Sequence, residues 1–130
     1  MANPNIVSVS SIKGESVGFA LSATTTTTLM TVASDKVVKV NRITCANVDG
    51  PNASDLTLSV TKSNFTPDGI SNFDTSGTFH LAKTVSVPAD ATLVILDTPI
   101  YLMEGDVLKG GAGAASDLEL FVSYESIDDA

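Results

Sequence analysis

Period two in the pattern of apolar residues is the feature of this sequence that most restricts its fold. In "DLTLSVTKS", Leu56, Leu58 and Val60 alternate with polar side chains, as they do in a strand with one buried face. No window holds apolar residues at the spacing of three and four that an amphipathic helix requires. The sequence therefore predicts an all-β protein.

Two further runs show how this alternation is used. The last run, "SDLELFVSYESI", separates an apolar series from a mostly polar one: Leu118, Leu120, Val122 and Tyr124 against Glu119, Phe121, Ser123 and Glu125. In "KVVKVNRITCAN" the apolar positions change parity, from Val38 and Val40 to Ile43 and Cys45. A strand buried on both faces would also give such a pattern, but a β-bulge is the interpretation that we favour.

The number of such runs indicates the architecture. About eight strands in 130 residues can form a jelly roll or an Ig-like sandwich, and the long middle connections favour the jelly roll. We therefore expect a single-domain, jelly-roll-like antiparallel β-sandwich over residues 1–130, with the threonine run from Thr24 as a polar edge strand. The segment "TLVILDTPIYLM" is too apolar for an exposed edge. It is predicted to bury Leu93, Ile95, Ile100 and Leu102 in the centre of the sandwich, and the stretch from Thr98 to Ile127 is predicted to form a meander there.

Two segments are not expected to form part of the sandwich core. Residues 1–12 form a candidate N-terminal arm, and residues 63–77, rich in Asn, Asp, Ser and Gly, are predicted to form a long loop. Compact domains rarely carry such loops without a function. We expect partner contacts here, through Ile6, Val7, Phe65, Ile70 and Phe73, although the loop residues could instead fix the loop to its own domain.

The residue types argue against catalysis and against a metal site. His80 and Cys45 are the only histidine and cysteine, so the chain lacks a set of transition-metal ligands, and no serine lies in a G-x-S-x-G motif. Asp49 and Asp55 belong to the loop "NVDGPNASD", which lacks the spacing of a calcium loop and is better explained as a turn with Asx hydrogen bonds. We expect no enzyme activity, no catalytic or metal-binding residue and no cofactor, with Cys45 a buried thiol.

Charge and hydropathy restrict the partners. The formal net charge is −8 and the seven basic residues are scattered, which argues against nucleic acid. No run approaches the roughly 20 apolar residues of a membrane span, and the N-terminus does not resemble a signal peptide, so we expect no membrane contact and synthesis in the cytoplasm without export. The chain has no Trp, and Tyr101 and Tyr124 fall in strands expected to be core, which argues against an aromatic platform for sugars.

A family resemblance is carried by several short features in series. They are a strand that ends in an Asn-rich turn ("VNRITCANVDGPN"), a strand of the "LTLSV" type, a "VSVPA" turn, a "PIYLMEGD" corner and a "SYE" close. Together, over roughly Val37 to Ile127, they resemble the small virion structural proteins of tailed bacteriophages. The resemblance implies a β-sandwich that decorates or cements the capsid, or that lies in the neck or tail.

The composition is consistent with that class. Charged residues make up only 17% of the chain, so a neutral, β-rich surface is available to bind a lattice. We expect a non-enzymatic capsid cement or decoration protein on the virion surface, with the major capsid protein and copies of itself as partners, a trimer being one arrangement. A neck or tail component and a carbohydrate- or receptor-binding module are the alternatives.

Overall fold

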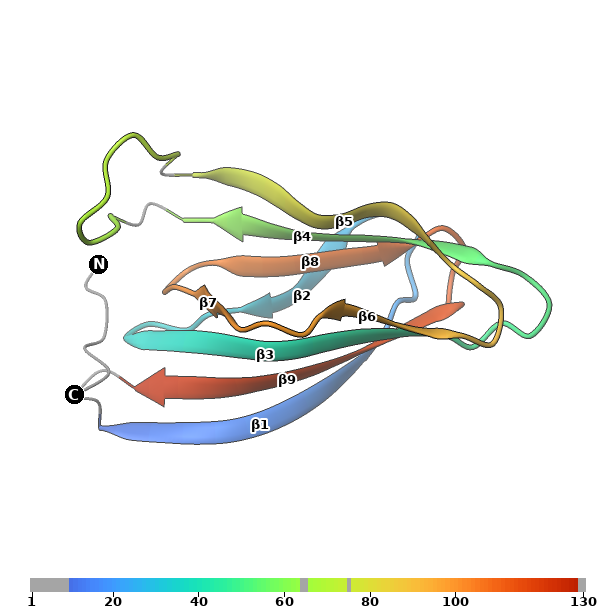
Figure 1. The fold of residues 1–130 in the computed structure, drawn as a ribbon, viewed down its shortest axis with the longest axis horizontal. Coiled ribbons are helices and arrows are strands. Elements are labelled where there is room, and N and C mark those ends of the chain that lie inside the picture. Colours follow the sequence, from blue (N-terminus) through green and yellow to red (C-terminus); the bar gives the residue numbers. More distant parts are fainter. Residues whose placement is uncertain (1–9, 64–65, 75, 129–130) are drawn as a thin grey trace.

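The computed structural model describes residues 10–63, 66–74 and 76–128, which form nine strands and no helix (Figure 1). The predicted all-β class is therefore confirmed. The strands are β1 (Ser11–Ala20), β2 (Thr27–Thr31), β3 (Lys36–Asn47), β4 (Ser54–Lys62), β5 (Gly77–Val87), β6 (Thr92–Leu96), β7 (Ile100–Leu102), β8 (Val107–Ala112) and β9 (Leu118–Asp128).

The strands form two antiparallel sheets with jelly-roll topology. One has the order β1-β9-β3-β6, with β7 also paired to β3, and the other has the order β2-β8-β4-β5. β6 pairs with Ile43–Ala46 of β3 and β7 pairs with Val38–Val40, so β6 and β7 occupy successive lengths of one edge position. Counted as one strand, they give the eight-stranded double Greek key of a jelly roll. The predicted fold class is confirmed.

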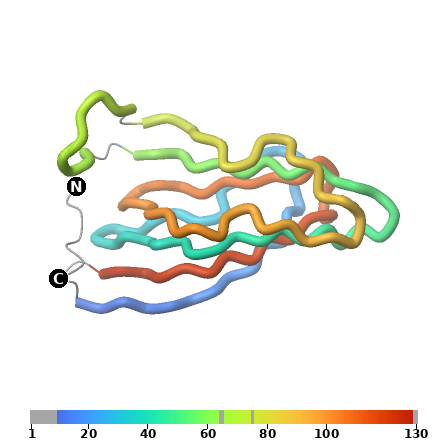
Figure 2. Tube along the Cα trace, in the orientation of Figure 1, coloured from blue at the N-terminus to red at the C-terminus, as the bar shows by residue number. Residues whose placement is uncertain are grey.

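The inner faces of the two sheets form the core. Leu56, Leu58 and Val60 point inward from β4, as their alternation predicted, and meet Leu120 and Val122 of β9 in one buried cluster. In β3 the register shifts between Val40 and Arg42, which confirms the predicted bulge. Cys45 is fully buried, as expected. The tube in Figure 2 shows how the first and last strands, β1 and β9, lie side by side over their full lengths.

The prediction for β6 and β7 was wrong in its placement. These strands lie at the edge of their sheet, and Leu93, Ile95 and Ile100 are only half-buried, whereas Leu102 is buried. β7, β8 and β9 alternate between the two sheets and so do not form a meander. An edge strand has a neighbouring strand on one side only. Its inward-facing side chains are therefore covered on that side and partly exposed on the other.

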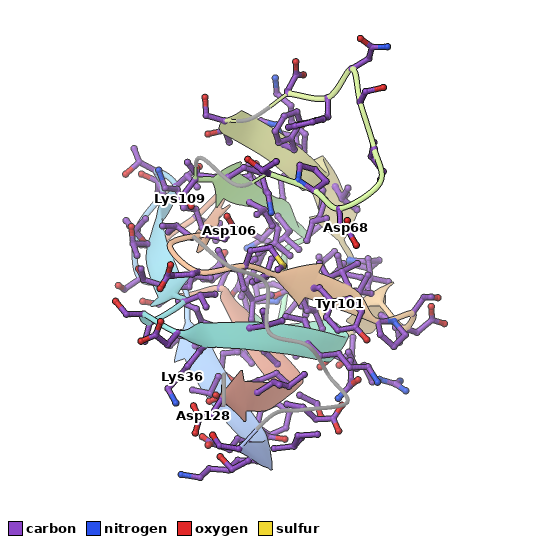
Figure 3. The ribbon with its side chains drawn as sticks, turned by 90° about the vertical axis from the view of Figure 1, so that its left-hand side faces the viewer. Lys36, Asp68, Tyr101, Asp106, Lys109 and Asp128 are labelled. Carbon is purple, nitrogen blue, oxygen red and sulfur yellow. The ribbon has the colours of Figure 1, made fainter. Side chains whose placement is uncertain are left out.

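One end of the sheet that contains β1 is closed by an ion pair. Lys36 of β3 pairs with Asp128 of β9, and Ser11 Oγ of β1 donates a hydrogen bond of 2.7 Å to the same carboxylate (Figure 3). A single side chain thus connects three neighbouring strands.

A buried carboxylate fixes the corner between β7 and β8. Asp106 is fully buried; it accepts hydrogen bonds from the backbone N–H groups of Met103 (2.8 Å) and Ser63 (3.0 Å), and it pairs with Lys62 at the end of β4. Gly105 beside it has a φ of 84°, and a Cβ there would lie 2.8 Å from Ser63 Oγ. The corner therefore requires glycine at position 105 followed by aspartate at position 106. Asp106 also connects the corner to β4, which belongs to the sheet that does not contain β7.

Replacing Asp106 by alanine removes the acceptor of two backbone N–H groups and the buried carboxylate that pairs with Lys62. We expect the free energy of unfolding, measured in urea, to fall by about 3 kcal/mol or more. Asp97→Ala, which removes an exposed carboxylate between β6 and β7, is the control and should cost less than about 0.5 kcal/mol. Equal, small losses in the two variants would contradict the role assigned to Asp106.

Candidate functional site

The residues predicted to contact a partner lie only partly within the described chain. Ile6, Val7 and Phe65 fall outside the described residues. Ile70 and Phe73 lie between β4 and β5, where Ile70 is 63% exposed and Phe73 is half-buried. Ile70 thus presents an aliphatic side chain to solvent at the end of the sandwich where β4 ends and β5 begins (Figure 1).

A second surface, which we call the outer face, is the side of the β1-β9-β3-β6 sheet that points away from the core. Ile12, which is 53% exposed, begins the outward series of β1, and the residues that follow it are three very small ones, Gly14, Gly18 and Ala20, together with Ser16. These side chains rise little above the backbone. The side chains of β9 and β3 therefore project from a nearly flat surface.

An apolar row crosses the middle of the outer face. Gly18, Phe121, Thr44 and Val94 lie opposite one another on the four strands. Phe121 is 55% exposed and Val94 is 48% exposed. A Cβ at Gly18 would lie 3.6 Å from Cδ1 of Phe121, so the ring packs in ordinary contact over the space that glycine leaves.

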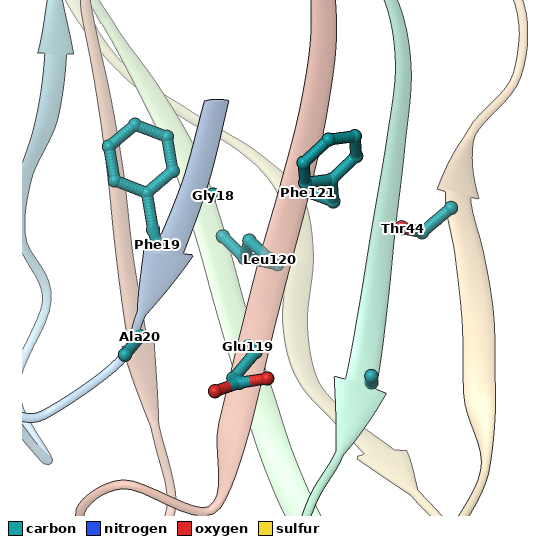
Figure 4. Close-up of a pocket in the computed structure, with 8 residues that line it drawn as sticks. Gly18, Phe19, Ala20, Thr44, Glu119, Leu120 and Phe121 are labelled. Carbon is teal, nitrogen blue, oxygen red and sulfur yellow. The ribbon is translucent and has the colours of Figure 1, made fainter. Parts of the chain in front are cut away.

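A shallow depression lies beside this row, with a volume of about 270 Å³ (Figure 4). Its outward-facing walls are Phe121 and Glu119 of β9, and small residues flank them on both sides. In the strand register Glu119 lies between Ala20 and Ala46. The depression thus combines a ring, a carboxylate and a floor of small side chains.

The charges of the outer face are distributed in an ordered way. Lys39 Nζ lies 3.4 Å from Glu125 Oε2, and Asn41 donates to the same oxygen. Arg42 and Glu119 are both exposed, and neither takes part in an ion pair recorded among the described residues. The face therefore carries one internally neutralised pair and two charges of opposite sign that face solvent.

The two tyrosines occupy different environments. Tyr101 of β7 is 48% exposed on the outer face, opposite Lys39, so the expectation that it lies in the core was wrong (Figure 3). Tyr124 is half-buried against the core and donates a hydrogen bond of 3.0 Å to Glu15. Burial, followed by this hydrogen bond, raises the pKa of Tyr124.

Two other exposed apolar side chains, Phe79 and Val85, belong to the margin of the core. Phe79 lies opposite Val60 and Val85 lies opposite Leu56, so both are on the inner side of the edge strand β5. Their exposure follows from the position of β5 at the edge of its sheet. Phe121 and Val94 differ, because they point away from the core altogether.

Cys45 and His80, the two residues considered for catalysis or metal binding, lie in different environments. Cys45 is fully buried, and burial raises the pKa of its thiol to about 11, which keeps it protonated at neutral pH. His80 is exposed on β5, opposite Ser59. Within the described ranges no group of three His, Cys, Asp or Glu side chains is arranged to hold a metal ion.

Two polar features lie at the end of the sandwich that contains the turn after β3. The backbone N–H of Asp49 donates to Asn47 Oδ1 at 2.9 Å, which is the Asx turn expected for this loop. At the same end of the β2-β8-β4-β5 sheet, threonines and Asp55 line a hydroxyl-rich hollow, formed by Thr24, Thr25, Thr26, Asp55, Thr57, Thr84, Gly111, Ala112 and Gly113.

No protein-family model, no curated protein and no solved structure matches this chain. Of residues 10–63, 66–74 and 76–128, none forms a helix that is long and apolar enough to cross a membrane.

Sequence reasoning did not select the outer face, although a signal was present. Phe121 stands in the polar series of the last run, between Glu119 and Ser123, where an aromatic residue has no reason to be buried. The glycines of "KGESVGFA" weaken a strand unless something packs closely against it. Neither signal alone predicts that the strand with these glycines will lie beside the strand with Phe121.

Two adjacent residues of β9 test the assignment of faces. Leu120→Ala should lower the free energy of unfolding by about 2 to 5 kcal/mol, because Leu120 is buried in the core. Phe121→Ser should lower it by less than about 1 kcal/mol, because the ring is largely in solvent. Urea titrations give both values. A larger loss for Phe121→Ser than for Leu120→Ala would contradict the assignment.

Proposed function

We propose that this protein is a non-enzymatic structural protein of a tailed-phage virion, of the capsid cement or decoration type, that binds and stabilises the capsid lattice. The observation that supports this function is the presence of two separate, exposed apolar surfaces on one small jelly roll, the loop with Ile70 and the outer face with Phe121 and Val94. A cement protein requires more than one contact surface, because it must connect subunits to one another. Jelly rolls also recur among viral structural proteins, which is support by analogy.

The energetics of such surfaces suit repeated, shallow contacts. Burying one Phe, Val or Ile side chain contributes roughly 1.5 to 3 kcal/mol. Two or three such side chains give only weak affinity for one copy, since association itself is costly. Many copies on one lattice gain avidity, which is how a small, flat protein can bind a capsid firmly.

The proposed partners are the major capsid protein and further copies of this chain, on the virion surface. We assign the capsid contact to the loop between β4 and β5, with Ile70 and Phe73, and to the N-terminal segment with Ile6 and Val7; Phe65 belongs to the same proposal. The outer face then remains available for a second contact. A trimer at a capsid threefold position is one arrangement of the copies, and a place in the neck or tail would use the same two surfaces.

A carbohydrate- or receptor-binding module is the second candidate. The exposed rings of Tyr101 and Phe121 on one face favour it, because aromatic faces stack on sugar rings. Tyr101, however, lies in the row of Lys39 and Glu125, whereas Phe121 lies in the row of Thr44. A glycan array separates the two candidates, since only the second predicts a specific signal that Tyr101→Ala and Phe121→Ala remove.

Co-sedimentation with undecorated capsids tests the proposed function. Wild-type protein should pellet with the capsids, and Ile70→Ser should raise the dissociation constant roughly tenfold or more, because one exposed aliphatic contact is lost. Val48→Ser is the matched control, since Val48 is 50% exposed in the turn after β3, away from the loop.

The outcomes separate the parts of the proposal. Failure of the wild-type protein to pellet would contradict the proposed function. Binding by Ile70→Ser that equals binding by Val48→Ser and wild type would show that the loop does not contact the capsid. Thermal melting of each free variant verifies that the fold is intact.

A further inference from the structure

We propose that the outer face is a self-complementary surface on which two copies of this chain pair face to face, with Arg42 of each copy bound in the Glu119–Phe121 depression of the other. This inference rests on the proposed function only in identifying the second contact surface; the pairing itself would occur in solution. A second copy is inferred as the partner from the arrangement of three successive rows of side chains on the outer face.

The rows place an acid, a ring and a base in order along the sheet. Glu119 lies opposite Ala46, Phe121 lies opposite Thr44, and Ser123 lies opposite Arg42. The row of Phe121 is therefore midway between the rows of Glu119 and Arg42. Glu119 is on β9 and Arg42 is on the neighbouring strand β3, so the two charges lie diagonally on either side of the ring.

This arrangement satisfies the requirement of an isologous interface. In a twofold pair, if residue i contacts residue j of the partner, then j contacts i. The twofold axis lies in the plane of the interface, passes between Phe121 and Thr44, and is perpendicular to the line from Glu119 to Arg42. Rotation about this axis brings each Arg42 over the other copy's Glu119. The rings of the two Phe121 residues then lie near the axis.

The chain's own arginine does not fill the depression. Ser123 and Glu119 are four residues apart on β9, which is roughly 13 Å along an extended strand. Arg42 is exposed, and no ion pair between it and Glu119 is recorded among the described residues. Each charge is thus available to a second copy.

The depression has the chemistry that a guanidinium group prefers. A planar guanidinium stacks on an aromatic ring and forms two parallel hydrogen bonds with a carboxylate. Phe121 and Glu119 supply these two groups side by side. Ala20, Ala46 and Gly18 keep the surface low, so the methylene groups of an arginine can lie against it. Arg42 is the only arginine in the chain.

The outer face also escapes the repulsion expected for a chain of net charge −8. Over the outward positions of β1, β9 and β3, the charged residues are Glu119, Glu125, Lys39 and Arg42, which sum to zero. Two copies can therefore approach through this face without bringing like charges together. The exposed side chains of Phe121 and Val94 supply the apolar centre that such an interface needs.

Charge exchange tests the pairing in the purified protein. Analytical ultracentrifugation of the wild type should show a reversible dimer. Glu119→Arg alone and Arg42→Glu alone should each raise the dimer dissociation constant roughly tenfold or more, because like charges then meet. The double variant Glu119→Arg with Arg42→Glu should restore dimerisation. Asp68→Arg in the loop makes the same change of net charge as Glu119→Arg and should leave the dimer unaffected.

Each other outcome overturns the inference. A wild type that stays monomeric at high protein concentration, a dimer that both single reversals leave unchanged, or a double variant that is no better than the single ones would each do so. Circular dichroism and melting temperature identify a variant that has failed to fold, and Phe121→Leu, which keeps an apolar side chain but removes the ring, then serves as a second probe with an expected loss of roughly threefold or more. None of these measurements uses capsids, so their failure is distinct from failure of capsid binding.

Discussion

Apolar contact between the inner faces of the two sheets is the interaction on which the rest of this structure depends. Leu56 and Leu58 of one sheet and Leu118 and Leu120 of the other are fully or almost fully buried in it. Because the side chains of a strand alternate between its faces, using one series for the core leaves the other series free. The outer face is therefore available for binding, and changes there need not weaken the fold.

Polar interactions serve a different purpose, which is to fix the ends of the sandwich. Asp106 holds the corner before β8 against the end of β4, and Asp128 connects β1, β9 and β3. Both carboxylates lie where strands begin or end, beside the small buried apolar cluster of Val37, Met103 and Ile127. In the central part of the outer face, by contrast, Glu119 and Arg42 have no ion-pair partner among the described residues, so these two charges lie where a contact is proposed.

The sequence predicted which segments form strands better than it predicted which strands lie beside one another. Alternation correctly assigned the two faces of β4 and β9, and the change of parity in β3 correctly indicated a bulge, because both signals are local. The placement of β6 could not be predicted in the same way. The apolar run "TLVIL" is expected for a strand buried on both sides, yet in the structure Val94 points outward and is exposed.

The candidate surface was missed for the same physical reason. Whether Tyr101 and Phe121 are buried depends on which strands lie beside them and on whether anything covers the sheet, and pairing between β1 and β9 joins residues more than 90 positions apart. A strand pattern gives the face of a side chain and not the neighbours of the strand. Gly18, where a Cβ would lie 3.6 Å from the ring of Phe121, acquires this neighbour only through that long-range pairing.

A cryo-electron microscopy map of the parent particle tests the central claim, that this jelly roll binds the capsid through one surface and a second copy through another, most directly. We expect jelly-roll density on the capsid surface, with the loop between β4 and β5 against a capsid subunit and the outer face against the same face of a second copy across a twofold axis. Jelly-roll density that is absent from the capsid, or an outer face that is open to solvent in every copy, would contradict it.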